Sequence, residues 1–165
     1  MPRYIRQRDN YSCGPVALLN ALKWAGATKG TSYDTLPSWR NICKTTRRRG
    51  TSFTDLFHAA RMLPLIGARK ARPKVKLADI DAHLRHGGAV ILGSFSERMS
   101  GFHWFLVTGK VDMAGEPSYT VVNFDRRSTQ RLVSAKTVRR SMRLAAKRNG
   151  YPRALFLRAP GKGVR

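Results

Sequence analysis

Acidic residues are scarce in this chain. It has 9 Asp and Glu against 32 Lys and Arg, which leaves a formal net charge of +23. Such an excess attracts polyanions, so nucleic acid, an anionic membrane surface and an acidic protein are the partners to expect. Charge alone, however, describes solubility and non-specific association rather than fold. A basic surface that merely coexists with nucleic acid in its compartment explains the charge equally well.

Cysteine is also rare. Cys13 and Cys43 are the only two in 165 residues, which excludes a disulfide scaffold, although one bridge between them remains possible. No C-x-x-C pair and no Cys/His cluster at ligand spacing occurs, so a structural zinc site is not expected. His83 and His86 lie close in sequence, but no carboxylate or cysteine completes a metal set around them. We therefore expect no metal and no other cofactor.

Long apolar runs are missing as well. The longest falls far short of the ~18 residues that span a membrane, so we expect no transmembrane segment. Residues 1–6 lack the apolar core of a secretory signal peptide. These absences predict a cytoplasmic protein, or one packaged in an intracellularly assembled particle such as a virion, rather than one secreted through a signal peptide.

The chain does hold enough apolar residues for a core. At 42% hydrophobic content, it predicts one domain over 1–159, with a basic, flexible tail at 160–165. Apolar residues at helical spacing predict helices over 14–25, 33–43, 78–86 and 135–148, and another that ends at residue 62. A period of two predicts strands over 89–95, 101–111, 118–125, 131–133 and 153–158. This is the α+β pattern, with an N-terminal helical part packed on an antiparallel sheet.

One short segment combines a thiol with a helix start. A polar loop over 7–12 leads to Cys13-Gly14, directly before the first apolar helix. Backbone N–H groups and the helix dipole there favour the thiolate, which is the nucleophilic form. Gln7 could reach back beside the cysteine and donate, together with the Cys13 N–H, to an oxyanion. The pattern predicts a cysteine nucleophile at Cys13, whereas Cys43 is expected to be a buried small hydrophobe.

His103 is the candidate general base. It comes near the start of the strand predicted over 101–111, where a side chain can emerge at the edge of a cleft. Strand alternation turns the next residue, Trp104, to the opposite face. On the returning strand, Asn123 and Asp125 share a parity, and either could accept from the ring N–H and fix its tautomer. The remaining histidines are expected to be surface or packing residues: His58, His83 and His86.

The order of these groups resembles the papain-like cysteine peptidases. More narrowly, it is similar to the peptidase C39-like group, known from bacteriocin-processing domains of export transporters and from stand-alone relatives. The likeness is carried by 7–22, 50–52, 78–95 and 103–108, and it covers most of 5–135. The resemblance implies a papain-like fold in which Cys13 is the nucleophile, His103 the general base and Gln7 the oxyanion donor.

The third member of the triad stays open between two residues. The C39-like group usually has an Asp followed by Pro after the second strand, whereas this chain has Asn123 and Asp125 there and no proline. Asp125 fits the residue type, and Asn123 fits the broader papain pattern. Asn123 is slightly favoured, because Asp125 lies nearer the strand end and beside two arginines.

The predicted function is that of a cysteine peptidase that hydrolyses a peptide or isopeptide bond in a peptide or protein substrate. The same groups would also serve transfer or deamidation, because the acceptor decides the outcome. The alternative is a basic nucleic-acid-associated protein, or a structural protein of a virion or nucleoprotein, on a peptidase-like scaffold with little catalysis. Basic residues gather at 44–49, 69–76, 126–131 and 136–148, and phosphate contacts there would make binding strongly salt-dependent.

Overall fold

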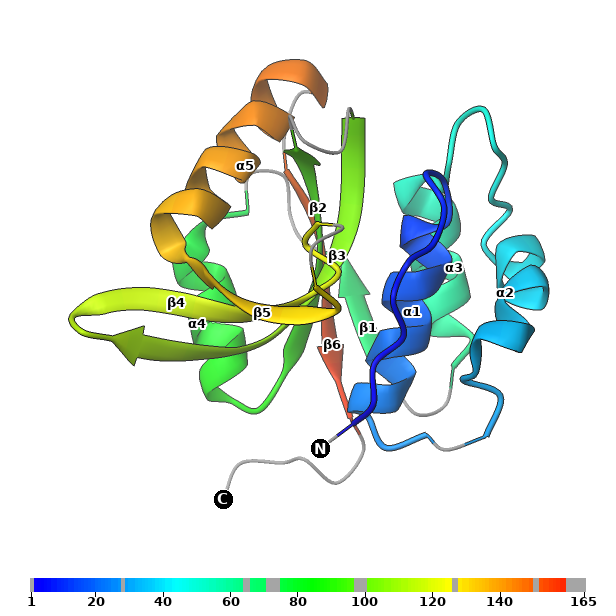
Figure 1. Cartoon of the computed structure of the whole chain (residues 1–165), viewed down its shortest axis with the longest axis horizontal. Coiled ribbons are helices and arrows are strands. Elements are labelled where there is room, and N and C mark those ends of the chain that lie inside the picture. The colour runs from blue at the N-terminus through cyan, green and yellow to red at the C-terminus, as the bar shows by residue number, and fades with distance from the viewer. Residues whose placement is uncertain are drawn as a thin grey trace.

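A sheet lies between two groups of helices (Figure 1). The computed structural model describes residues 2–27, 29–63, 66–70, 75–96, 101–125, 128–149 and 152–159. Helices α1 (Cys13–Trp24), α2 (Leu36–Ile42) and α3 (Phe53–Arg61) lie on one side, and α4 (Leu77–Arg85) and α5 (Ala135–Asn149) on the other. The predicted α+β class, with N-terminal helices packed on an antiparallel sheet, is confirmed. The predicted tail at 160–165 lies outside the described residues.

Within the described residues, six strands form one sheet in the order β1-β6-β2-β3-β4-β5. They are β1 (Gly67–Lys70), β2 (Ala89–Ser96), β3 (Gly101–Met113), β4 (Glu116–Val122), β5 (Gln130–Ser134) and β6 (Arg153–Arg158), and all neighbours are antiparallel. β2 pairs with β3 over 101–107, whereas the register with β4 begins at Leu106, opposite Val122. The first residues of β3 are therefore open toward the β4 side, and the chain leaving β4 crosses that opening.

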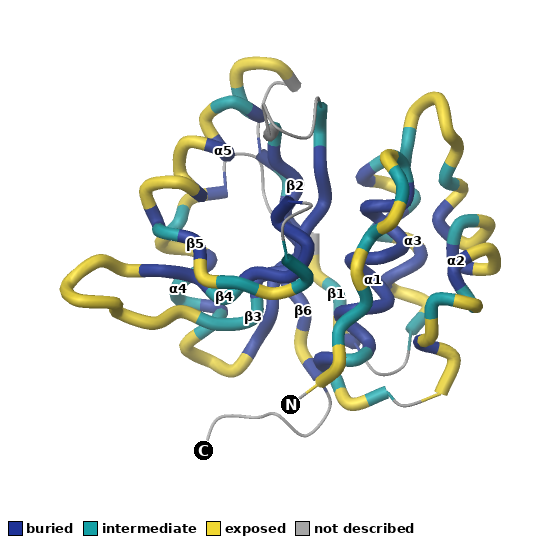
Figure 2. The backbone as a smooth tube through the Cα atoms, viewed as in Figure 1, coloured by how far each residue is buried: buried dark blue, intermediate teal, exposed yellow. Residues whose placement is uncertain are grey.

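Apolar side chains fill both faces of the sheet, and burial is greatest in β2, in β6 and in the middle of β3 (Figure 2). One core joins α1 and α3 to the sheet through residues such as Leu18, Leu56 and Trp104. The other joins α4 and α5 to the opposite face through residues such as Ile80 and Phe105. Trp104 and Phe105 thus face opposite ways, as strand alternation predicts.

Helix α1 is buried almost all round, with 11 of its 12 residues inaccessible to solvent. A helix that is apolar on every side is a core helix rather than an amphipathic surface helix. Its buried polar residue Asn20 is satisfied by the N-terminal arm, residues 2–12, which runs along the helix (Figure 1). Asn20 Oδ1 accepts from Ile5 N–H at 2.8 Å, and Asn20 Nδ2 donates to Ile5 O at 2.9 Å. The arm and the helix are therefore fixed to each other.

Two element predictions need correction, and one strand was not predicted. The helix predicted over 33–43 is a 3-10 turn, Tyr33–Thr35, followed by α2, which starts where Pro37 falls in its first turn. The additional strand is β1, which pairs with β6. β4 ends at Val122 rather than at 125, because Asn123 takes a left-handed backbone with φ 56°. The parity that placed Asn123 and Asp125 on one strand face therefore does not hold.

Candidate functional site

Cys13 lies where α1, the loop before α3 and β3 meet. It is the first residue of α1 and only 6% exposed. A Cβ on Gly14 would lie 2.5 Å from Thr51 Oγ1, so only glycine lets this loop pack against the helix start. The Trp104 indole donates to Thr51 O at 3.1 Å, which joins the loop to β3. The thiol is thereby enclosed on several sides.

Burial raises the pKa of the Cys13 thiol. Backbone N–H groups of Trp104, Gly14 and Cys13 itself lower this pKa, and the charge of Asp9 raises it, but burial is the largest effect. The N–H groups at the helix start thus lower the thiol pKa, as the sequence predicts, but the net direction of the shift is upward. The donors are present, yet the loss of water outweighs them. To act as a nucleophile, the thiol needs a proton acceptor when it attacks.

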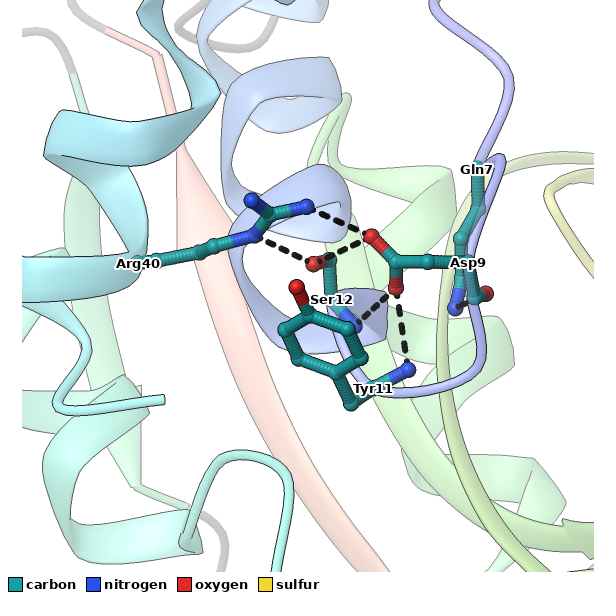
Figure 3. A network of polar contacts seen from close by, with 5 residues as sticks. All are labelled: Gln7, Asp9, Tyr11, Ser12 and Arg40. Carbon is teal, nitrogen blue, oxygen red and sulfur yellow. Dashed lines mark hydrogen bonds and ion pairs between the residues drawn. The ribbon is translucent and has the colours of Figure 1, made fainter. Parts of the chain in front are cut away.

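Asp9 holds the loop before Cys13 in one conformation (Figure 3). Its Oδ1 accepts from the backbone N–H groups of Tyr11 at 2.9 Å and Ser12 at 2.7 Å. Its Oδ2 accepts from the Ser12 hydroxyl at 2.7 Å and from Arg40 Nη2 at 2.6 Å. Arg40 also donates through Nε to Ser12 Oγ at 2.7 Å. Burial raises the Asp9 pKa, but the hydrogen bonds from Ser12, Tyr11 and Arg40 outweigh it and leave the pKa below its usual value.

The sequence interpretation missed this cluster. An Asp three residues before a Ser, directly ahead of a helix, is a signal for a carboxylate that accepts from the following N–H groups. That spacing could have identified Asp9 and Ser12. Arg40 has no such local signal, because it belongs to α2 and reaches the loop only through the tertiary fold.

Asp9→Asn should lower the free energy of unfolding by about 1–3 kcal/mol at neutral pH. The amide cannot accept from both Ser12 and Arg40 at the position of Oδ2. Because the native pKa of Asp9 is lowered, the stabilisation is fully present above the unfolded pKa of about 3.9 and is lost as pH falls through the native pKa. The gap between wild type and variant should therefore close in acid, which urea unfolding over a pH series measures.

The matched control for this change is Asp34→Asn, the same substitution at an exposed carboxylate. It should change the free energy of unfolding by less than ~0.5 kcal/mol at any pH. If the difference in free energy of unfolding between wild type and Asp9→Asn stayed constant down to strong acid, the carboxylate charge would not be what holds the loop.

Gln7 lies on the arm just before Asp9. Its Nε2 donates to Asp9 O at 2.7 Å, while its Oε1 is buried and makes no hydrogen bond. The amide nitrogen carries two hydrogens. The bond to Asp9 uses one of them and leaves one for an oxyanion, so the role of Gln7 as oxyanion donor stays a prediction.

His103 is held by a main-chain carbonyl. Its ring is 3% exposed and stacks with Phe105, and its Nε2 lies 2.5 Å from the backbone oxygen of Asn123. A carbonyl oxygen can only accept, so Nε2 carries the hydrogen and Nδ1 has the lone pair in the neutral ring. Asn123 directly follows β4, whose register with β3 begins only at Leu106, so its carbonyl meets the ring at the open edge of β3. The main chain thus fixes the tautomer in which Nδ1 can take a proton.

The two candidates for the third member have different partners. The Asn123 side chain ties down the N-terminal arm: Nδ2 donates to Ile5 O at 2.8 Å, and Oδ1 accepts from Gln7 N–H at 3.2 Å. Asp125 is buried, and its Oδ2 accepts from Arg131 Nη2 at 2.5 Å. The structure therefore brings Gln7, His103 and Asn123 into one connected set. Trp104, which follows His103 in β3, links this set to Cys13, because its backbone N–H lowers the pKa of the thiol.

The other singled-out residues lie elsewhere. Cys43 is fully buried, and burial, with a smaller effect of Asp55, raises its pKa to about 12. Both cysteines are free, so the bridge that remained possible is not formed. His83 packs in the core and shares a hydrogen bond of 2.8 Å with Leu157 O, whereas His58 and His86 are exposed.

Among the described residues, no three or more His, Cys, Asp or Glu side chains gather so as to hold a metal ion. Nor does any helix in this part of the chain combine the length and the apolar character needed to cross a bilayer.

No family profile and no curated protein matches the chain in sequence. Its structure is similar to the crystal structure of the peptidase domain of Streptococcus ComA, a bifunctional ABC transporter involved in a quorum-sensing pathway. The match has a TM-score of 0.70 and covers 97% of this chain and 99% of that one, at 18% sequence identity. Identity this low establishes a shared fold and not a shared activity. The chain therefore has the fold of that peptidase domain, which is the papain-like, C39-type fold that the sequence predicts.

Proposed function

We propose that this protein is a cysteine peptidase that hydrolyses a peptide or isopeptide bond. Cys13 Sγ attacks the carbonyl carbon, and the thiol proton passes to His103 Nδ1. The Gln7 amide and the Cys13 N–H donate to the oxyanion. His103 then protonates the leaving amine, and water releases the acyl group from the sulfur.

The observation that carries this proposal is the position of His103, whose Nε2 is held by Asn123 O. The backbone N–H of the next residue, Trp104, lowers the pKa of the Cys13 thiol. Both observations support a proton acceptor on β3 close to the thiol. A protonated thiol in a site shielded from water suits general-base catalysis, since proton loss is coupled to attack. The ComA peptidase domain has the same fold, which supports this chemistry, although a shared fold does not by itself assign an activity.

Alkylation by iodoacetamide, followed for each cysteine by mass spectrometry, tests the proposal. At near-neutral pH, Cys13 should react about tenfold or more faster than Cys43, because His103 can accept its proton. His103→Ala should slow the alkylation of Cys13. It should also move the pH at which the alkylation rate rises to a higher value, because burial alone keeps the thiol protonated. Cys43, whose pKa is raised to about 12, is the internal control and should be unaffected. A Cys13 no more reactive than Cys43 would count against a live site.

A second candidate function, binding of nucleic acid, is favoured by α5. The helix contains no acidic residue, and its inner face packs on the sheet through Val138 and Met142. Its exposed basic residues are Lys136, Arg139, Arg140, Arg143, Lys147 and Arg148. Such a face is suited to phosphate contacts. Two results together would favour this function over hydrolysis. The affinity for duplex DNA should fall steeply with salt and in the double variant Arg139→Ser/Arg143→Ser, and Cys13 should be unreactive.

A further inference from the structure

A pocket of about 250 Å³ opens beside the candidate nucleophile. Its lining residues are Thr51, Ser52, Phe53, Phe102, Trp104 and Arg153. Two of them touch the site, since Thr51 packs on Gly14 and the Trp104 N–H faces the Cys13 sulfur. The volume is below the ~300–1,000 Å³ of typical small-molecule sites. It therefore suits one side chain of an extended peptide whose carbonyl lies at Cys13.

A glycine in one row of the sheet sets where the aromatic walls of this pocket lie. Arg153 on β6, Gly93 on β2 and Trp104 on β3 are direct neighbours in register, so their Cα positions present the same face. Gly93 has no side chain, and two aromatic rings occupy the space above it, because a Cβ there would lie 2.4 Å from Phe102 Cζ and 2.5 Å from Trp104 Cζ3. The glycine thus lets both rings lie over the backbone between Trp104 and Arg153.

The walls are aromatic and mutually packed. Phe53 stacks with Trp104 at a centroid distance of 5.9 Å, and Phe102 meets Trp104 edge-on at 4.9 Å. The Arg153 guanidinium carbon lies 5.6 Å from the Phe53 ring centroid, so the arginine is positioned by a cation–π contact. Apolar walls accommodate methylene groups, and a guanidinium binds a carboxylate through parallel N–H donors.

We propose that this pocket receives an acidic side chain of the peptide substrate, glutamate above all, at a residue next to the cleaved bond. This assignment rests on the proposed peptidase function and names its substrate class. The ring walls contact the glutamate methylenes, and Arg153 binds the carboxylate. The net charge of +23 also favours the approach of acidic peptides. Arg153 is thus a specificity-determining residue, remote from bond cleavage itself.

Peptidyl acyloxymethyl ketones that differ in one residue, Glu, Gln or Lys, next to the reactive carbon test the pocket. The measurement is the second-order rate constant for modification of Cys13. In wild type, the Glu probe should react roughly tenfold faster than the Gln probe. Arg153→Gln should remove this preference, and Arg153→Glu should turn it toward Lys. Arg139→Glu, the same charge change on exposed α5, should keep the Glu preference, which separates the pocket from the overall charge.

Equal rates for the Glu and Gln probes in wild type, or a Glu preference that survives in Arg153→Glu, would overturn the assignment. If no probe modifies Cys13, the proposed peptidase function fails instead. The same peptides without the reactive group then test the pocket alone, by fluorescence anisotropy. Glu-selective binding that is lost in Arg153→Glu supports the pocket assignment, and binding without such selectivity overturns it.

Discussion

Cys13→Ala should lose hydrolysis of every substrate that wild type cleaves, by a factor of at least ~10³ in kcat. Alanine cannot form the acyl intermediate, whereas the oxyanion donors and the Arg153 pocket remain in place. The fold should persist, because the change removes one sulfur atom from a side chain that already packs against apolar neighbours. Steady-state kinetics on a protein substrate, with circular dichroism to check the fold, measure both expectations.

Cys43→Ala is the matched control, because it removes the same atom from a fully buried site in the same core. It should lower the free energy of unfolding by about 1 kcal/mol and leave the activity per folded molecule unchanged. If Cys13→Ala kept full hydrolysis, or if Cys43→Ala were the inactive variant, the assignment of the nucleophile would be wrong.

His103→Ala should lower kcat by about 10²–10⁴-fold, the usual contribution of a general base. Asn123→Gly, in contrast, should cost less than ~10-fold, because glycine accepts φ 56° and keeps the carbonyl that holds His103. Asn123→Gly should still lower the free energy of unfolding by about 1–2 kcal/mol, since the bonds to Ile5 and Gln7 are lost. Kinetics and urea unfolding of the two variants separate the two roles of Asn123. Its main-chain oxygen holds His103, and its side chain holds the N-terminal arm.

The same series decides which group orients the imidazole. If Asn123→Gly were as inactive as His103→Ala, the orienting group would be the side-chain amide rather than the main chain. Asp125→Asn tests the other candidate for the third member. Asp125 accepts a hydrogen bond from Arg131. A loss for Asp125→Asn that equals the loss for His103→Ala would make Asp125 the third member instead.

Much of this architecture could be predicted because the relevant patterns are local. The apolar spacing after Gly14 defines α1, and the period of two after Gly101 defines β3 and places Trp104 and Phe105 in different cores. The order of Gln7, Cys13 and His103 pointed to the papain-like fold, which the structure confirms. Short-range periodicity survives folding because it reflects which face of an element is buried.

The rest depends on contacts that no local pattern encodes. β4 ends at Val122 because Asn123 turns to meet Ile5, far away in sequence. The dipole at the start of α1 is visible in the sequence, but the burial that raises the Cys13 pKa is a property of the packed layers. Arg153 becomes a pocket residue only because the register puts it beside Gly93. These features arise from contacts between segments that are distant in sequence, which residue order alone does not specify.

The N-terminal arm has a mechanical consequence for the site. Ile5 O accepts from Asn20 on α1 and also from Asn123 at the end of β4, so one peptide group links the helix that begins with Cys13 to the segment that orients His103. Sliding of α1 against the sheet would break these bonds together. We therefore expect the arm to act as a crosslink that limits movement of the Cys13 sulfur relative to the His103 imidazole. For the proposed nucleophile and base, such a limit would favour the narrow range of separations that attack requires.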